Sequence, residues 1–186
     1  IDGIFGTHRF LAHILNPALY SFLIATFEIL AFLVLFSCII FLIRRNILKI
    51  KRFWSKEMTK WPKTDANLIL IFEIFLMSAF FLMNAADQVL QSKDVSHYLL
   101  AGSFPISSFF VGLLDGFSIE TLVLIERASW WFHILGILAF LNYVLISKHL
   151  HIFFAFPSTY YANINKLGKI DNLTSVTKEV KLMLDP

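Results

Sequence analysis

The chain has 186 residues, of which 58% are hydrophobic and 21 are phenylalanine. A soluble domain of this length cannot bury so much apolar surface, so the composition excludes that class and predicts an all-α, polytopic transmembrane helical bundle. The single Cys38 lies within an apolar run, which excludes a disulfide framework and a thiolate-ligated iron–sulfur cluster among these residues. The formal charge of +3 is informative only through the places where the charges lie.

The first 43 residues predict an interfacial turn followed by a membrane span. Residues 1–16 mix glycines and histidines with apolar residues, and Asn16 followed by Pro17 is typical of a helix start, with Asn as the cap. A first span is predicted over residues 18–43, which are long enough to cross about 30 Å of hydrocarbon with some tilt. The chain begins with Ile1 and shows no signal-peptide pattern, so we expect an upstream part.

Residues 44–63 form a strongly basic loop. They contain eight Lys or Arg residues and one acidic residue, Glu57. By the positive-inside rule, the loop is expected on the cytoplasmic side of the membrane, in a multi-pass protein. Topology accounts for this charge, so the loop indicates no nucleic-acid partner, and the spans themselves imply membrane lipid as the surroundings.

A second span is predicted over residues 67–88, and its polar residues share one face. With Glu73 as the reference, Asn84 lies about 20° and Asp87 about 40° away around a helix. A face of this kind does not point at lipid. Two interpretations remain open for it, namely hydrogen bonding between helices of the bundle and a stripe that handles protons or a quinone.

The segment of residues 89–118 is the long outer connection. It holds a single basic residue, Lys93, which agrees with a position outside the cytoplasm. Within it, FPISSFFVGLL (residues 104–114) is too short to span a membrane and predicts an interfacial or re-entrant helix. A third span is predicted over residues 119–147.

An apolar segment with a histidine in its middle, residues 129–157, carries the main functional signal. If it is one continuous helix, His133 and His151 lie 18 positions apart, on nearly the same face and separated by roughly 27 Å. Gly136 leaves room for a flat group near the backbone, so the pattern predicts one or two b-type haems. His149 points about 160° away from His133 and is the second choice for the inner site. The two later histidines are also explained as interfacial polar residues, whereas His133 lies inside the apolar run, where an ionisable side chain indicates a site.

The same interpretation assigns the groups around the haems. Each low-spin b-type haem needs a second axial imidazole, and His8 is the choice for the outer site among the outer histidines, while the inner partner is expected from the upstream part. Arg127 lies about 9 Å outward of His133 along a helix and would neutralise a haem propionate. The alternative is that Glu126 and Arg127 form an ion pair between helices, because buried charges persist only with partners.

After a membrane domain of residues 1–157, residues 158–186 form a polar tail. Apolar residues at helical spacing predict a short amphipathic helix that docks on a partner domain: Val176, Val180, Met183 and Leu184. Thirteen of the sixteen basic residues lie in or next to this tail and the 44–63 loop, which places both on the cytoplasmic side.

The His133 and His151 pair on the last membrane helix resembles the membrane cytochrome b subunit of respiratory nitrate reductase and its relatives in heterodisulfide reductase. More broadly, the run from IDGIFGTHR through WWFHILGILAFLNYVLISKHLHIFFAFP to VTKEVKLMLDP resembles the membrane domain that precedes a dicluster 4Fe–4S ferredoxin domain in bacterial iron–sulfur oxidoreductases. The resemblance implies an outer haem at His133, an inner haem at His151, and 4Fe–4S clusters only outside this chain. The earlier helix that supplies the other ligands in that family is absent from these residues.

Two functions follow from this reading. The first is a membrane anchor and electron-transfer subunit that carries b-type haem between the quinone pool, menaquinone or ubiquinone, and a cytoplasmic iron–sulfur oxidoreductase module. The second is a haem-free anchor that only tethers and positions a partner complex. In both, the chain is part of an oxidoreductase rather than a catalyst by itself. A small transporter is a third hypothesis, supported only by the polar face of the second span.

Overall fold

The computed structural model describes residues 9–54, 60–98, 101–147, 149–162 and 173–184. Regular structure in these ranges is helical: α2 (Phe10–Ile14), α3 (Pro17–Leu42), α4 (Trp61–Ser92), α5 (Ser108–Leu114), α6 (Ile119–Val144), α7 (Leu150–Tyr160) and α8 (Thr174–Leu184). A π-helical turn, η1 (Ile43–Ile47), continues α3, and a 3-10 turn, η2 (Lys51–Phe53), follows it. The predicted all-α class is confirmed.

Three helical segments are long and apolar enough to cross a membrane: Pro17–Ile47, Trp61–Ser92 and Ile119–Val144. This confirms the prediction of three spans. The first begins as predicted, because the Asn16 side chain accepts a hydrogen bond from the backbone N–H of Ala18 at 2.9 Å. The third is capped by Ser118, whose hydroxyl accepts from the N–H of Thr121 at 3.3 Å.

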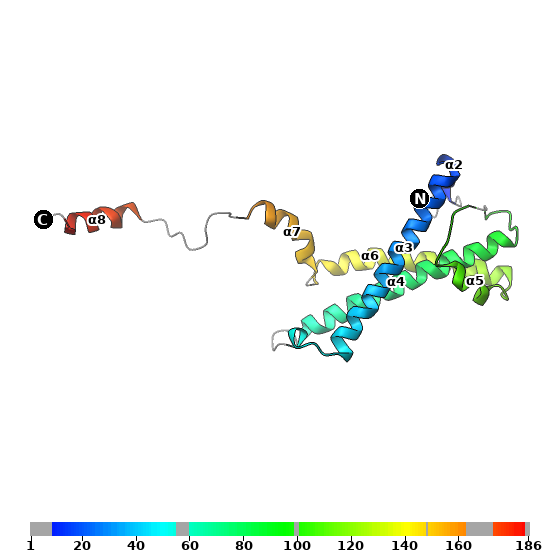
Figure 1. Ribbon diagram of the computed structural model, residues 1–186, viewed down its shortest axis with the longest axis horizontal. Coiled ribbons are helices and arrows are strands. Elements are labelled where there is room, and N and C mark those ends of the chain that lie inside the picture. Colours follow the sequence, from blue (N-terminus) through cyan, green and yellow to red (C-terminus); the bar gives the residue numbers. More distant parts are fainter. Residues whose placement is uncertain (1–8, 55–59, 99–100, 148, 163–172, 185–186) are drawn as a thin grey trace. The chain divides into compact units, whose positions relative to one another are not determined.

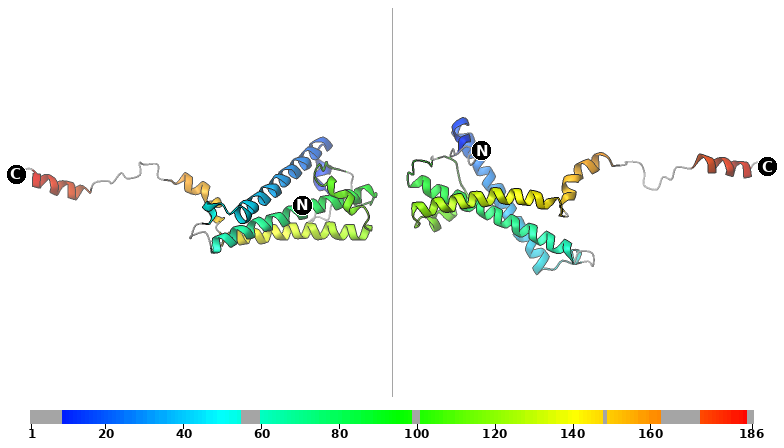
Figure 2. Two further views of the ribbon diagram at one scale, coloured as in Figure 1. Left: turned by 60° about the horizontal axis from the view of Figure 1, so that its bottom comes forward. Right: turned by 180° about the vertical axis from the view of Figure 1, so that it is seen from behind.

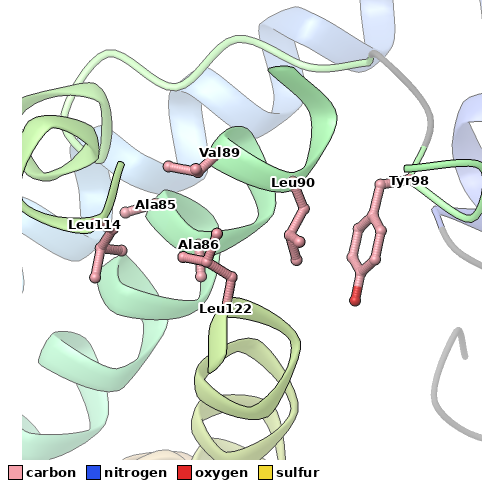
Figure 3. Close-up of a cluster of buried hydrophobic side chains, with 7 residues drawn as sticks. All are labelled: Ala85, Ala86, Val89, Leu90, Tyr98, Leu114 and Leu122. Atoms are coloured by element: carbon pink, nitrogen blue, oxygen red, sulfur yellow. The ribbon is translucent and has the colours of Figure 1, made fainter. Parts of the chain in front are cut away.

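Helix α4 is the centre of the first compact unit, residues 1–149, and α3, α5 and α6 all pack against it (Figure 1). Figure 2 shows α6 running beside α4 along most of its length. We call the end of this bundle at the 44–63 loop the loop end and the opposite end the far end. The apolar core lies at the far end (Figure 3) and consists of Ala85, Ala86, Val89, Leu90, Tyr98, Leu114 and Leu122.

Small residues and a short helix explain the packing at the far end. Ala85 and Ala86 are fully buried, and small side chains let neighbouring helices approach closely. Helix α5 packs Leu114 into this core, whereas its Phe109 is 80% exposed. The predicted interfacial helix at residues 104–114 is thus present as α5, with one face on the bundle and one apolar face outward. Most of the outer surface of α3 is likewise apolar and suited to lipid.

The condition for aligning His133 with His151, one continuous helix over residues 129–157, is not met. Helix α6 ends at Val144, and the N–H groups of residues 145–147 bond to carbonyls three residues back, at 3.0 to 3.3 Å. The Ser147 hydroxyl accepts from the N–H of His149 at 3.1 Å and donates to Asp65 of α4. A serine side chain that bonds locally in this way competes with the helical pattern, and α7 starts anew at Leu150.

The second compact unit comprises residues 150–186. Helix α7 is an apolar helix with Pro157 inside it and exposed aromatic residues, including Phe156 and Tyr160. Helix α8 is amphipathic, as predicted from residues 176–184, with Val176 and Val180 beside Leu173 on its apolar face.

Candidate functional site

Two carboxylates of the spans are fully enclosed at the far end, and the first is Glu28 of α3. Its side chain is 0% exposed and accepts hydrogen bonds from Asn84 Nδ2 at 3.0 Å and from the backbone N–H groups of Ile106 and Ser107 at 2.9 and 3.1 Å. The Ser107 hydroxyl donates to it as well. Four donors are what a carboxylate needs in place of water, so Glu28 ties α3 to α4 and to the segment that leads into α5.

The second enclosed carboxylate is Asp87 of α4, which forms an ion pair with Arg9. Arg9 Nε donates to Asp87 Oδ2 at 2.9 Å, and a second guanidinium nitrogen, Nη2, also contacts this oxygen. The Arg9 guanidinium further donates to the Tyr20 hydroxyl at 3.0 Å and lies 4.6 Å from the Phe104 ring centre. Burial lowers the pKa of Arg9, but Asp87 and Tyr20 outweigh it and hold the pKa above its ordinary value.

The predicted inward face of the second span is therefore confirmed for Asn84 and Asp87, which bond to other segments. Glu73, about three turns before Asn84 on the same helix, is half-buried and interacts electrostatically with His133 of α6 and Cys38 of α3. Interhelical hydrogen bonding accounts for Asn84 and Asp87. For Glu73 the interaction with another helix is electrostatic, with His133 of α6.

A cavity of about 420 Å³ lies beside the Arg9 and Tyr20 contact. Its walls come from α2, the start of α3 and the chain after residue 100, and they are Ala12, His13, Pro17, Tyr20, Ser21, Ala101 and Gly102. The Tyr20 oxygen accepts from Arg9, so its own O–H is available to donate, and His13 and Ser21 add further polar groups. An apolar-walled space with a few polar groups suits a small ring that carries oxygen acceptors.

His133 is held from one side by α4. Its Nδ1 lies 3.0 Å from the backbone oxygen of Leu76, and its ring centre lies 5.8 Å from that of Phe80. Because a carbonyl can only accept, Nδ1 carries the hydrogen in this contact, and Nε2 is the ring nitrogen that remains for another partner. Metal-bound histidines are oriented in the same way, through an N–H bond to a backbone carbonyl or a carboxylate. The imidazole thus fits the role of an axial ligand.

Helix α4 packs closely against α6 at Gly136. A Cβ built at Gly136 would lie 2.5 Å from Leu76 Cδ2 and 3.5 Å from Phe72 Cζ, so side chains of α4 already fill the place that the glycine opens. On the side of Gly136 that faces α4, the room expected for a flat group is occupied by the packing of α4 on α6. Within the described ranges, moreover, no three His, Cys, Asp or Glu side chains gather as a metal site.

The other predicted haem residues are spread over the chain. His8 lies outside the described residues. His149 is half-buried at the turn after α6, and His151 is exposed on α7, in the other compact unit. With α6 ending at Val144, the helical alignment of His133 with His151 has no structural basis. Any role of these residues as ligands stays a prediction.

Arg127 belongs to a small polar cluster at the far end. Its Nε lies 3.2 Å from Glu126 Oε2 and its Nη2 lies 3.4 Å from His97 Nε2. The Tyr98 hydroxyl donates to Glu126 Oε2 at 3.2 Å, and burial together with the charge of Glu126 raises the pKa of Tyr98 to about 12. This ion pair joins neighbours on α6, and the cluster contacts another segment through Tyr98 and His97.

Sequence reasoning missed a further buried carboxylate, Asp65, at the loop end. It is 0% exposed, and it accepts hydrogen bonds from the hydroxyls of Tyr143 and Ser147, the latter at 3.1 Å. The predicted loop ended at residue 63 and the predicted span began at residue 67, so Asp65 fell between the two. The structure extends α4 back to Trp61, and a helix of that length carries Asp65 inside the bundle.

Comparison with known proteins finds a curated relative that matches most of this chain. The chain is 31% identical over 154 residues to the "Probable iron-sulfur-binding oxidoreductase FadF" of Bacillus subtilis (strain 168), a match that covers 82% of this chain. The chain spans only 20% of the length of that curated relative. No protein-family model and no solved structure matches the chain. The chain is therefore a distant homologue of one part of an iron–sulfur-binding oxidoreductase. This agrees with the predicted resemblance to bacterial iron–sulfur oxidoreductases.

Proposed function

We propose that this chain is the membrane-embedded domain of an iron–sulfur oxidoreductase and that it holds the redox module at the cytoplasmic face of a bacterial inner membrane. The observation that carries this proposal is a bundle of three apolar helices in a chain related to part of an iron–sulfur-binding oxidoreductase. The buried carboxylates Glu28 and Asp87 are satisfied inside the bundle, and the outer surface left for lipid is largely apolar. The 4Fe–4S clusters belong outside this chain.

The basic loop and the tail set the orientation in this proposal. Eight basic residues lie in the 44–63 loop, and α8 carries an apolar face suited to docking on the cytoplasmic iron–sulfur domain or subunit. Single cysteines placed in the loop and in the tail of a Cys38→Ala background test this. Both are expected to react with a membrane-impermeant maleimide only from the cytoplasmic side. Labelling of the two segments from opposite sides would overturn the orientation and, with it, the docking role of the tail.

A second candidate function is electron transfer between the quinone pool and that module through b-type haem. The contact that favours it is the one between His133 Nδ1 and the Leu76 carbonyl, which presents Nε2 as a ligand atom. A bound haem would supply one-electron redox chemistry midway across the membrane. Within this chain, His133 would hold it; His8 would be the outer axial partner, Arg127 the propionate partner, and His151 or His149 the inner ligand.

The packing at Gly136 restricts the side from which a haem could reach His133 in this second candidate function. Because Leu76 fills the α4 side, a porphyrin would have to approach His133 from the side away from α4. For a quinone, the cavity of His13, Tyr20 and Ser21 offers donors beside the Arg9 and Asp87 pair, and Glu73 is the carboxylate that remains for proton exchange.

A dithionite-reduced minus oxidised optical spectrum of the membrane-extracted chain separates the two candidates. Sharp absorption bands of a low-spin b-type haem at a stoichiometry near one or two per chain are expected for the electron-transfer function. A haem-free spectrum from a well-folded protein, prepared with haem supplied during expression, leaves the anchoring function and removes the haem.

A further inference from the structure

At the loop end, the side chain of the exposed Trp54 lies close to the ammonium groups of two lysines. Lys63 Nζ lies 3.6 Å from the Trp54 ring centre and Lys49 Nζ lies 5.5 Å from it. The indole is fixed in turn, because its Nε1 donates to the backbone oxygen of Arg45 at 3.2 Å. Among the residues that the structure describes, neither lysine forms an ion pair with a carboxylate. Two ammonium groups thus lie against one indole ring, and no carboxylate of the described residues pairs with either of them.

A third cation, Arg45, lies behind this pair. Its side chain is only 7% exposed, and its guanidinium donates to the backbone oxygen of Pro62 at 3.2 Å. The Arg45 Nε is buried and finds no acceptor within the described part of the chain. Asp65 attracts Arg45 electrostatically, but its carboxylate is already bonded to hydroxyls of α6 and forms no ion pair with the guanidinium. The positive charge of Arg45 is therefore only partly balanced.

These cations surround the start of α4. That helix begins at Trp61, its cap residue is Lys60, no side chain caps it, and its first turn holds no acidic residue. Helix starts carry partial positive charge and are normally stabilised by acidic residues, so a cluster of Lys60, Lys63 and Arg45 there is unfavourable unless an anion binds. Helix starts with basic neighbours are anion sites, phosphate sites above all.

The residues next to this cation cluster indicate which kind of phosphate compound binds there. Ile47 and Leu48, immediately before Lys49, are 71% and 64% exposed, and they continue the apolar surface of the first span. A ligand at this place meets hydrocarbon on one side and cations on the other. We propose that the loop end binds one anionic phospholipid, with its headgroup phosphate between Lys49 and Lys63 at the start of α4 and its acyl chains along Ile47 and Leu48. This site is independent of the haem question.

Native mass spectrometry of the full chain in detergent, titrated with dioctanoyl phosphatidylglycerol, tests the proposal. One lipid per chain is expected to stay bound, and dioctanoyl phosphatidylcholine is expected to bind at least tenfold more weakly. The variant K49Q/K63Q is expected to lose roughly 30-fold in affinity for phosphatidylglycerol, from the contribution of two basic residues near a lipid phosphate. The matched control K178Q/K181Q removes the same charge from α8 and is expected to bind as the unaltered chain does.

Two further arms decide the source of the phosphate and guard against misfolding. Inorganic phosphate at millimolar concentration is expected not to displace the lipid, and K49R/K63R is expected to restore binding with an unchanged melting temperature. Equal loss in K178Q/K181Q would mean a non-specific charge effect. Displacement by inorganic phosphate, or displacement by an acidic peptide such as polyglutamate, would identify a free-anion or a protein site. Each of these results overturns the proposal.

Discussion

Glu28 of α3 and Asn84 of α4 meet inside the bundle, where the amide of Asn84 donates to Glu28 Oε1 at 3.0 Å. The same carboxylate accepts from the backbone at Ile106 and Ser107, so one buried side chain joins three segments that are far apart in the sequence. Buried groups of this kind are conspicuous in a membrane helix because an unmatched one is so costly. Glu28 therefore organises the far end of the bundle.

Replacing Glu28 with Ala is expected to destabilise the bundle by about 3–5 kcal/mol, because it leaves the donors of Asn84, Ile106 and Ser107 without an acceptor. Glu28→Gln keeps one acceptor oxygen and is expected to cost less. Thermal unfolding in detergent, followed by circular dichroism, measures both. The control is Glu120→Gln, at an exposed position in the first turn of α6, where only a few tenths of a kcal/mol are expected. Equal effects at the two positions would contradict this account.

The Arg9 and Asp87 pair predicts strong coupling between two single substitutions. Arg9→Met or Asp87→Leu alone leaves a buried charge without its partner, at a cost of about 3–5 kcal/mol. The double variant removes both charges and is expected to recover much of that loss. A double-mutant cycle on unfolding free energies in detergent measures the coupling. Additive losses in the double variant would show that the pair is not buried as described.

The helices and the inward face of α4 could be predicted from the sequence, because periodicity and length are local properties. Asn84 and Asp87 fall on the same face for geometric reasons alone, and Asn16 marks the start of α3 by its own side chain. The partners of these residues could not be predicted. Nothing local links Glu28 to Ser107, 79 positions later, or Asp65 to Ser147, 82 positions later.

The end of helix α6 at Val144 is another feature that depends on contacts distant in the sequence. The segment of residues 129–157 is apolar enough to continue as one helix, and the prediction of aligned histidines depended on that continuity. The helix does not continue through Ser147, because the Ser147 hydroxyl donates a hydrogen bond to Asp65 of another helix and accepts one from the N–H of His149. At Gly136 the sequence indicates only that space exists. Whether a haem or a leucine fills that space depends on how α4 and α6 dock, and Leu76 fills it.

The loop end makes a prediction for Tyr143. Tyr143→Phe removes the hydroxyl that donates to the buried Asp65 carboxylate and is expected to cost about 1.5–3 kcal/mol, the range for a hydrogen bond to a charged group. Tyr161→Phe, at a position that is 82% exposed, is the matched control and is expected to be nearly neutral. Chemical unfolding in a mixed-detergent series measures both variants. A neutral Tyr143→Phe would remove Asp65 as an organising residue of the loop end.

The stability that Tyr98 gives to the far end is expected to be lost at strongly alkaline pH. An unfolded tyrosine has a pKa of about 10, and burial beside Glu126 raises that of Tyr98 to about 12. The folded state therefore favours the protonated phenol, so the contribution of Tyr98 is complete below pH 10 and is lost as the pH rises through 12. Melting temperatures of the unaltered chain and Tyr98→Phe, compared from pH 9 to 12, are expected to converge at the upper end. A constant difference across this range would contradict the raised pKa.

Haem ligation by His133 gives the most discriminating prediction. Nδ1 is bonded to the Leu76 carbonyl, so an iron can be bound only through Nε2, and His133→Ala is expected to remove one haem signal from the reduced spectrum. The bundle is expected to survive the change, because its far end is held by Glu28 and Asp87 rather than by this imidazole. His151→Ala, at an exposed position on α7, separates the one-haem from the two-haem case: it is expected to leave the His133-dependent signal intact and to remove only an inner one. Full haem content in His133→Ala would exclude His133 as a ligand. No haem in the unaltered chain, together with a lowered melting temperature in His133→Ala, would instead assign His133 to structure alone, as the residue that joins α6 to the backbone of α4.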